Sequence, residues 1–330
     1  MPRTQKLRRD VVVIGASAGG FSVLMDLVAA LPANFPAAVM VVLHVGAHAS
    51  ILPELFNRRG PLPALHPIQG QTLRSGMIHV APPDHHMLLN AGGIICLARG
   101  AKEHHARPAI DPLFRSVAIE CGARAIGVVL SGRLDDGTAG LQAIQQCGGL
   151  VVVQDPDDAE QPSMPASACA HVAVDHCVTR AQLADTLIAL AGQQVTAAPV
   201  APSRLVCEHR VTTGGGDPME DLKALGKPST FGCPDCDGVL WEIDASSPLR
   251  FRCHTGHGYS LRTLEHTQAS YSDKAMWSAL RALQEREGLL RAMADESRQH
   301  LDHAGGERFD TQAAEVARQS EQLHHFVVGV

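Results

Sequence analysis

The sequence contains no run of about 18 apolar residues, the length that a membrane-spanning helix needs. A basic start between Arg3 and Arg9 precedes a short apolar run at 11–14. Gly15 interrupts that run before it reaches the length of a signal-peptide core. We therefore interpret 11–14 as a first buried strand and expect a soluble cytoplasmic protein without a membrane span.

An excess of positive charge is also missing. Lys and Arg together number 28 against 34 Asp and Glu, which gives a formal net charge of −6. Domains that bind nucleic acid usually carry a basic surface, so we expect no nucleic-acid partner. The basic run at 6–9 is short and is interpreted as a solvated terminus.

The nine cysteines lack the pattern of a secreted disulfide framework. They are scattered through the first part of the chain and cluster only between Cys233 and Cys253. This distribution predicts reduced thiols and one metal site in a cytoplasmic protein.

Short β-branched runs alternate with segments of helical periodicity over residues 1–195. This alternation predicts an α/β domain with a doubly wound, mostly parallel sheet. Asp111 is expected to cap one of its helices, with Pro112 at the first helical position. We expect strands at 11–14, 39–43, 77–81, 126–130 and 150–154, helices at 21–31, 111–121, 138–147 and 182–191, and a hairpin at 87–98.

The composition changes after residue 195. Residues 196–228 are predicted to be a linker, because 193–203 show no apolar period and 211–218 include three consecutive glycines. Residues 229–260 form a short cysteine-rich unit, and residues 261–330 carry helical periodicity.

The helical segment at 261–330 has apolar residues at heptad spacing, among them Leu283 and Leu290. Gly305-Gly306 is expected to divide it, with a second helix at 309–328. An antiparallel hairpin and a helical seam between two copies of the chain both fit this pattern.

Ser17 lies between small residues where the first predicted strand turns into a helix. Such a turn exposes a hydroxyl at the carboxyl edge of a sheet, and backbone N–H groups such as that of Ala18 can face a developing oxyanion. A plain tight turn would produce the same pattern. The glycines around Ser17 also resemble an altered dinucleotide-binding motif, although Ser17 replaces the glycine that the pyrophosphate must approach.

His44 and Asp136 each follow another predicted strand. Taken singly, such a histidine is often a packing or surface residue, and Asp135-Asp136-Gly137 is typical of a turn or helix cap. Parallel strands end at the same edge, however, and that edge is where open α/β sheets place their sites. Ser17, His44 and Asp136 would supply a nucleophile, a general base and a group that orients the base.

Segments between residues 12 and 165 resemble, in order, the chemotaxis-type (CheB-type) protein-glutamate methylesterases. The resemblance implies that Ser17 attacks, that His44 moves the proton and that Asp136 orients His44. It also implies hydrolysis of glutamate methyl esters on helical cytoplasmic segments of chemoreceptors, with release of methanol, deamidation of glutamine side chains and no catalytic cofactor. The matching segments are 12–21, 42–44, 76–87, 107–116, 127–137 and 163–165.

Three departures from this family concern the substrate and the regulation. Arg133 and Leu134 stand where the family usually has Met and Gly, in a loop that borders the oxyanion region, so Arg133 is counted with Ala18 among the oxyanion neighbours. Val45-Gly46 follows His44 in place of the usual Met-Pro. Because the first hydrolase strand begins at Val11, we expect no N-terminal receiver domain and no control by its phosphorylation.

Cys233 and Cys236 form one potential metal-binding turn, and after sixteen intervening residues Cys253 and His257 form another. This spacing predicts a structural zinc site, with His254 as the alternative fourth ligand. One alternative is that these cysteines are surface thiols without a metal. Another is a redox Cys-x-x-Cys pair, which is disfavoured because no thioredoxin-like βαβ unit surrounds it. Receiver-less relatives of the methylesterases resemble this chain here too, with a similar ribbon followed by a helix.

The sequence therefore favours a serine esterase that acts on protein carboxyl methyl esters. A regulatory or binding module with the same fold and little turnover is the second interpretation. A nucleotide-binding protein or an unrelated hydrolase is the third.

Overall fold

The computed structural model describes residues 7–44, 46, 49–195 and 199–329. Lys6 of the basic run, Val45 and residues 196–198 of the predicted linker lie outside these ranges. The chain divides into two compact units, Met1–Leu264 and Glu265–Val330. No helix of the described part is long and apolar enough to cross a membrane.

The first unit is built on a parallel sheet with the strand order β3-β4-β2-β1-β7-β8-β9. Every residue of β1 and β2 is buried, because helices cover both faces and favour continuous β-branched strands. The sheet confirms the predicted doubly wound fold. The strands are β1 (Val11–Ala16), β2 (Ala38–Leu43), β3 (Ala64–Leu65), β4 (Ile78–Val80), β7 (Ala125–Val129), β8 (Leu150–Gln154) and β9 (His176–Val178).

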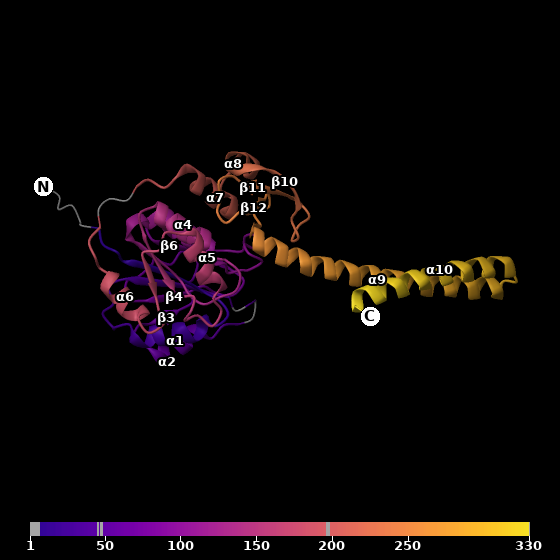
Figure 1. Ribbon diagram of the computed structural model, residues 1–330, viewed down its shortest axis with the longest axis horizontal. Coiled ribbons are helices and arrows are strands. Elements are labelled where there is room, and N and C mark those ends of the chain that lie inside the picture. Colours follow the sequence, from indigo (N-terminus) through magenta and orange to yellow (C-terminus); the bar gives the residue numbers. More distant parts are fainter. Residues whose placement is uncertain (1–6, 45, 47–48, 196–198, 330) are drawn as a thin grey trace. The chain divides into compact units, whose positions relative to one another are not determined.

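Helices cover both faces of the sheet (Figure 1), and alternate residues of β1 belong to the two separate cores beneath them. Val11 and Val13 belong to the core under α3, α4 and α5, whereas Val12 and Ile14 belong to the core under α1, α2 and α6. This period of two is the side-chain geometry of a strand. The helices are α1 (Gly20–Ala30), α2 (Leu52–Arg59), α3 (Ile110–Cys121), α4 (Thr138–Gln146), α5 (Ser163–His171) and α6 (Leu183–Leu190), with a short 3₁₀ turn at Gly122–Arg124.

The predicted hairpin is present as β5 (His86–Asn90) and β6 (Ile94–Ala98), an antiparallel pair outside the main sheet. The predicted cap of the helix at 111–121 is wrong. Helix α3 begins at Ile110 with Ala109 as its N-cap, and Asp111 lies inside the helix. The Asp111 carboxylate instead accepts backbone N–H groups at the start of α4, a contact that the local sequence does not reveal.

The segment predicted as a linker contains two helices, α7 (Ser203–Thr213) and α8 (Pro218–Leu225). Sequence periodicity missed α7 because its buried face includes Glu208 and Thr212, which are polar. Both side chains bind Arg115 of α3, a residue distant in the sequence. Residues 203–225 therefore pack on the first domain and do not form a loose connection.

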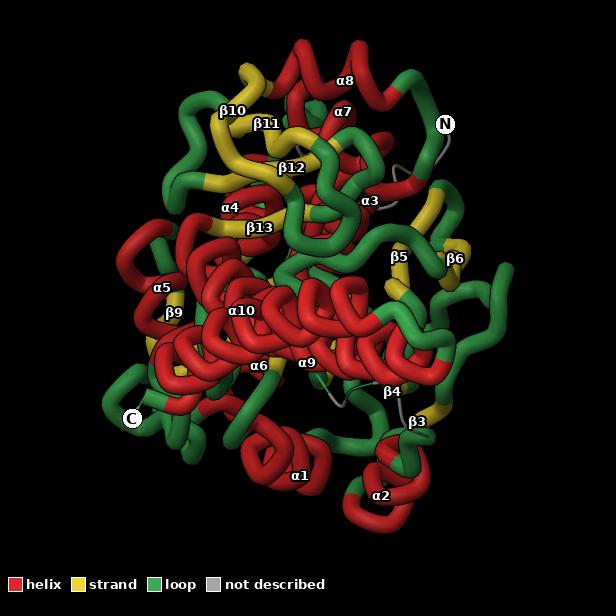
Figure 2. The backbone as a smooth tube through the Cα atoms, turned by 90° about the vertical axis from the view of Figure 1, so that its right-hand side faces the viewer, coloured by secondary structure: helices red, strands yellow, loops and turns green. Residues whose placement is uncertain are grey.

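The cysteine-rich unit is a four-stranded antiparallel sheet (Figure 2). Its strands are β10 (Gly226–Gly232), β11 (Val239–Ile243), β12 (Arg250–Cys253) and β13 (Gly258–Ser260). Leu240, Phe251 and Tyr259 form its small core. Arg252 of β12 is buried and binds Glu103 and Glu208, which ties this sheet to the first domain inside one compact unit.

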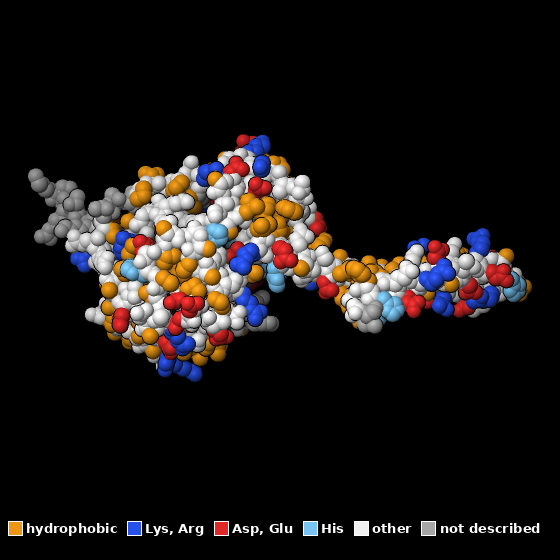
Figure 3. Space-filling model, in the orientation of Figure 1, with side chains coloured by type: hydrophobic (Ala, Val, Ile, Leu, Met, Phe, Trp, Pro, Cys, Tyr) orange, Lys and Arg blue, Asp and Glu red, His pale blue; other side chains and the backbone are white. Residues whose placement is uncertain are grey.

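The second unit consists of most of α9 (Leu261–Gln299) and all of α10 (His303–Val328). Leu283 and Leu290 of α9 pack against Phe309, Ala313 and Val316 of α10, which gives an antiparallel hairpin. Charged side chains of both signs lie along its surface (Figure 3).

The predicted break at Gly305-Gly306 is wrong, since both glycines lie inside α10. The chain turns four residues before Gly305, at Leu301, whose φ is 64°. The Asp302 carboxylate then accepts the Gly305 N–H and caps α10. A Cβ at Gly306 would lie 3.3 Å from the Ala294 carbonyl oxygen, so this glycine allows the two helices to approach closely.

Candidate active site

The candidate active site lies at the carboxyl edge of the sheet, where β1 has β2 on one side and β7 on the other. Ser17 directly follows β1, and His44 directly follows β2. Asp136 belongs to the loop between β7 and α4. The chain leaves β1 in one direction and returns on the other side with β7, the kind of switch point at which open α/β sheets bind ligands.

A tight turn holds Ser17 between β1 and α1. Its backbone N–H donates to the Ser131 carbonyl, and its own carbonyl accepts the Gly20 N–H. Gly19 has a φ of 77°, and a Cβ there would lie 2.5 Å from the Ser131 hydroxyl. The small residues around Ser17 are therefore required by the turn. Helix α1 has no side-chain cap, and Ala18 next to Ser17 is exposed.

The two ring nitrogens of His44 face the other two residues. His44 Nδ1 lies 3.2 Å from Ser17 Oγ, and Nε2 lies 3.0 Å from Asp136 Oδ2. The His44 side chain is 21% exposed and Asp136 only 2%. A neutral imidazole that donates Nε2–H to Asp136 leaves Nδ1 free to accept the serine proton, as a serine hydrolase requires.

Asp136 is held by the beginning of α3. Its Oδ2 accepts the Ile110 N–H at 2.7 Å, and its Oδ1 accepts the Asp111 N–H at 3.0 Å. Burial alone would raise the pKa of Asp136. The imidazoles of His104 and His44 and the Ile110 N–H outweigh burial and keep that pKa below its ordinary value. Asp136 is therefore a carboxylate in the orientation that His44 needs.

Arg133, a predicted oxyanion neighbour, is exposed, and its Nε donates to Gln161 Oε1 at 3.4 Å. The preceding Gly132 is packed so closely that a Cβ there would lie 2.9 Å from Ser17 Cβ. Arg133 thus belongs to a loop that touches Ser17. Of the pair that follows His44, Val45 is outside the described residues and Gly46 is exposed.

Sequence reasoning missed the roles of three further buried side chains at this site, His104, Asp111 and Asp135. Asp111 accepts hydrogen bonds from the beginning of α4. No motif marks His104, which becomes significant only through contacts with distant residues. His104, Asp111 and Asp136 lie close enough to suggest a metal site. His104 Nε2 lies 2.8 Å from Asp111 Oδ2, which is the geometry of a direct hydrogen bond.

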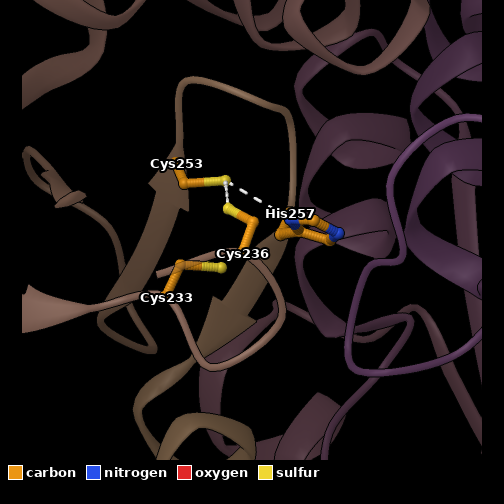
Figure 4. A group of neighbouring side chains, drawn as sticks. All are labelled: Cys233, Cys236, Cys253 and His257. Atoms are coloured by element: carbon orange, nitrogen blue, oxygen red, sulfur yellow. Dashed lines mark hydrogen bonds between the residues drawn. The ribbon is translucent and has the colours of Figure 1, made fainter. Parts of the chain in front are cut away.

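The four predicted zinc ligands converge at one end of the small sheet (Figure 4). Cys233 and Cys236 come from the β10–β11 turn, Cys253 is the last residue of β12, and His257 comes from the β12–β13 turn. Their ligand atoms all lie within 4.8 Å of one another. Three thiols and one imidazole are a donor set that suits tetrahedral zinc. His254, the alternative ligand, is not in this group and lies against Gly238.

The part of the chain that holds this site matches a known protein family. Residues 12–187 match the family model of the CheB methylesterase. The chain belongs to the CheB methylesterase family. This CheB-family domain includes the strands, the turns and all three residues of the candidate site, whereas the small sheet and the C-terminal helices lie outside the match.

Two curated relatives illustrate the range of the family. A putative protein-glutamate methylesterase/protein-glutamine glutaminase of Leptospira interrogans is 34% identical over 186 residues, which cover 55% of this chain and 94% of the relative. Protein-glutamate methylesterase/protein-glutamine glutaminase 3 of Anaeromyxobacter dehalogenans is 38% identical over 182 residues, 54% of this chain. This chain spans about half the length of the second relative, 53%.

A solved structure shows the same fold. The CheB methylesterase catalytic domain of Thermotoga maritima matches with a TM-score of 0.53 at 29% identity. The match covers 55% of this chain and 98% of the Thermotoga domain. The CheB-family part of this chain is therefore a whole catalytic domain, to which residues 203–329 add further elements.

Proposed function

We propose that this protein is a protein-glutamate methylesterase that uses Ser17, His44 and Asp136 to cleave glutamate methyl esters on chemoreceptor-type proteins. The observation that carries the proposal is the pair of His44 contacts, to Ser17 Oγ and to Asp136 Oδ2, inside a domain of the CheB methylesterase family. Relatives named protein-glutamate methylesterase/protein-glutamine glutaminase support this substrate and a second activity on glutamine side chains.

The proposed reaction proceeds through an acyl-enzyme. Ser17 Oγ attacks the ester carbonyl while His44 Nδ1 takes the hydroxyl proton. The tetrahedral intermediate then expels methanol, which receives that proton from His44, and leaves the glutamyl group esterified to Ser17. Water, activated by His44, releases the glutamate carboxylate and restores Ser17. With glutamine as substrate, the leaving group is ammonia.

We assign the stabilisation of the oxyanion to the turn after Ser17. The Ala18 backbone lies at the uncapped beginning of α1, where N–H groups have no partners within the helix. Arg133 lies in the loop that touches Ser17 through Gly132 and brings a cation to the same region. An acidic surface on the partner would therefore be favoured near Arg133.

We further propose that Cys233, Cys236, Cys253 and His257 hold one structural zinc ion. All four positions of a tetrahedral site are then occupied by protein, so the ion stabilises the small sheet and takes no part in catalysis. Nine free thiols fit a reducing compartment, and we propose a cytoplasmic location.

The C-terminal hairpin offers a surface for self-association. Tyr271, Trp277, Leu289 and Met293 of α9 are exposed although they are large and apolar. We propose that these exposed side chains of α9 form the contact surface of a homodimer. A regulatory module with little turnover is the second candidate, favoured by the added elements at 203–329, which lie outside the family match.

Methanol release tests the main proposal. Wild-type protein and Ser17→Ala are compared with a carboxyl-methylated receptor cytoplasmic fragment as substrate. We expect release from the wild type and none from Ser17→Ala, with unchanged circular dichroism. Equal release from both proteins would exclude Ser17 as nucleophile, and no release from folded, zinc-loaded wild type would favour the regulatory module.

A further inference from the structure

Asp136 has a second histidine neighbour besides His44. His104 Nε2 lies 2.8 Å from Asp111 Oδ2 and 3.8 Å from Asp136 Oδ1, and Nδ1 lies 3.8 Å from Asp135 Oδ1. The imidazole is 7% exposed and the three carboxylates at most 2%. One buried ring therefore faces three buried carboxylates, a costly arrangement unless positive charge is present.

The hydrogen bonds around His104 favour a proton on both of its nitrogens. Burial raises the pKa of Asp111, and when Asp111 is ionised it can only accept, so Nε2 donates to it. The Thr263 hydroxyl donates to Asp135 Oδ1 at 3.0 Å, so its oxygen is left to accept from His104 Nδ1 at 3.1 Å. Burial opposes this charge, but Asp136, Asp111 and Asp135 outweigh burial and raise the pKa of His104 to about 10.

The two carboxylates beside His104 also organise the helices of the site. Asp136 accepts the N–H groups of Ile110 and Asp111 at the beginning of α3. Asp111 in turn accepts the N–H groups of Gly137 and Gly140 at the beginning of α4. Each carboxylate thus binds one helix N-terminus, and His104 lies between them.

The remaining charges near His104 are compensated by other groups. Glu103 binds Arg115 and Arg252. His86 accepts the Ala109 N–H at Nδ1 and donates Nε2–H to the Ala101 carbonyl, so it is neutral.

Three further residues complete the surroundings. Ser260 adds a second hydroxyl donor to Asp135 Oδ1, at 2.7 Å. Tyr259 and Arg250 line the small cavity next to His104. Among the described residues, His104 and His44 are the imidazoles that lower the pKa of Asp136.

We propose that His104 is a positioning residue of the hydrolase, which compensates Asp111 and so keeps Asp136 ionised and directed at His44. The proposal rests on the proposed triad. Without His104, Asp111 and Asp136 would be like charges in a buried site, and one of them would bind a proton near neutral pH. A protonated Asp136 cannot stabilise the imidazolium that forms on His44 as Ser17 attacks.

The substitution His104→Gln in the full chain tests this role. A fluorophosphonate that reacts with activated serines measures the rate of Ser17 labelling between pH 5.5 and 9, independently of the natural substrate. We expect the acid limb of the rate profile to move to higher pH, with about a tenfold loss for each pH unit below the raised pKa of Asp136. The rate should return toward that of the wild type at high pH.

Thr263→Val removes the acceptor of His104 Nδ1 with little change in volume and should shift the same limb by a smaller amount. His171→Gln is the matched control, because His171 is an exposed histidine that binds the Ser247 hydroxyl far from the triad in sequence. Its profile should equal that of the wild type.

Two results would overturn the role of His104. One is a folded His104→Gln protein whose profile is unchanged or is lowered equally at every pH, which a merely structural residue would produce. If His104→Gln does not fold, an unchanged profile of Thr263→Val decides against the proposal. Wild type that Ser17-directed reagents do not label would overturn the triad itself, whereas labelling without methanol release would overturn only the methyl-ester substrate.

Discussion

Replacing Asp136 with Asn should remove most of the activity, because an amide cannot satisfy all three donors that now face the carboxylate. Oδ2 accepts from Ile110 N and His44 Nε2, and Oδ1 accepts from Asp111 N. An amide oxygen at Oδ2 would point its NH₂ group at the Asp111 N–H. The flipped amide would oppose both the Ile110 N–H and His44 Nε2–H.

The flipped amide is the damaging arrangement for catalysis. It favours the His44 tautomer with the proton on Nδ1, the atom that lies 3.2 Å from Ser17 Oγ, so His44 can no longer accept the serine proton. The equivalent change in another serine hydrolase lowers kcat by about 10⁴. We expect a loss of about 10³ to 10⁴ in kcat, or roughly 4 to 5.5 kcal/mol of transition-state stabilisation.

Methanol release and fluorophosphonate labelling are measured for wild type and Asp136→Asn at pH 7.5, with thermal unfolding to confirm the fold. Asp10→Asn is the matched control. Asp10 also accepts two hydrogen bonds, from Arg124, but it precedes β1 at the opposite end from Ser17. A rate for Asp136→Asn within about threefold of the wild type would refute the role of Asp136, since a tautomer change must cost far more.

Three further predictions concern the metal, the pH and the packing. Purified wild type should hold about one zinc ion per chain, and Cys253→Ser should lose it while Cys169→Ser does not; atomic absorption checks this, and metal-free folded wild type would contradict it. Because folding raises the pKa of His104 from 6.5 to about 10, its stabilisation is complete below pH 6.5 and is lost as the pH rises to 10. The unfolding free energy of wild type relative to His104→Gln should therefore fall across that window by up to about 1.4 kcal/mol per pH unit, and a constant difference in urea titrations would contradict it. Gly15→Ala should destabilise the protein by about 1–3 kcal/mol and slow turnover, because the added Cβ would lie 2.4 Å from Ile110 Cγ2 and displace the N–H that holds Asp136; unchanged urea unfolding would show that α3 yields without cost.

The sequence by itself determined the alternation of buried strands and helices and the edge at which the candidate site lies. Runs such as 11–14 and 126–130 are apolar and β-branched because both faces of a parallel sheet are covered, a property visible in local sequence. Ser17 and His44 directly follow such strands and Asp136 lies in the loop after another, which sufficed to predict one shared edge. Their catalytic roles stay predictions until they are measured.

The C-terminal hairpin was only partly predictable. Heptad spacing indicated packed helices, but the break follows from Leu301 and the Asp302 cap and not from Gly305-Gly306. Glycines usually mark helix ends because of their backbone freedom. Here Gly306 serves the close approach of two helices, a requirement that exists only once both helices are in place.

Only the tertiary structure decided the polar interior. Glu208 and Thr212 look like linker residues, yet they are buried because Arg115 and Arg252, distant in the sequence, supply their partners. His104 carries no motif and acquires its charge from carboxylates that the fold brings around it. Apolar burial follows a local period that sequence reveals, whereas buried charge depends on pairing between remote residues, which only the folded chain specifies.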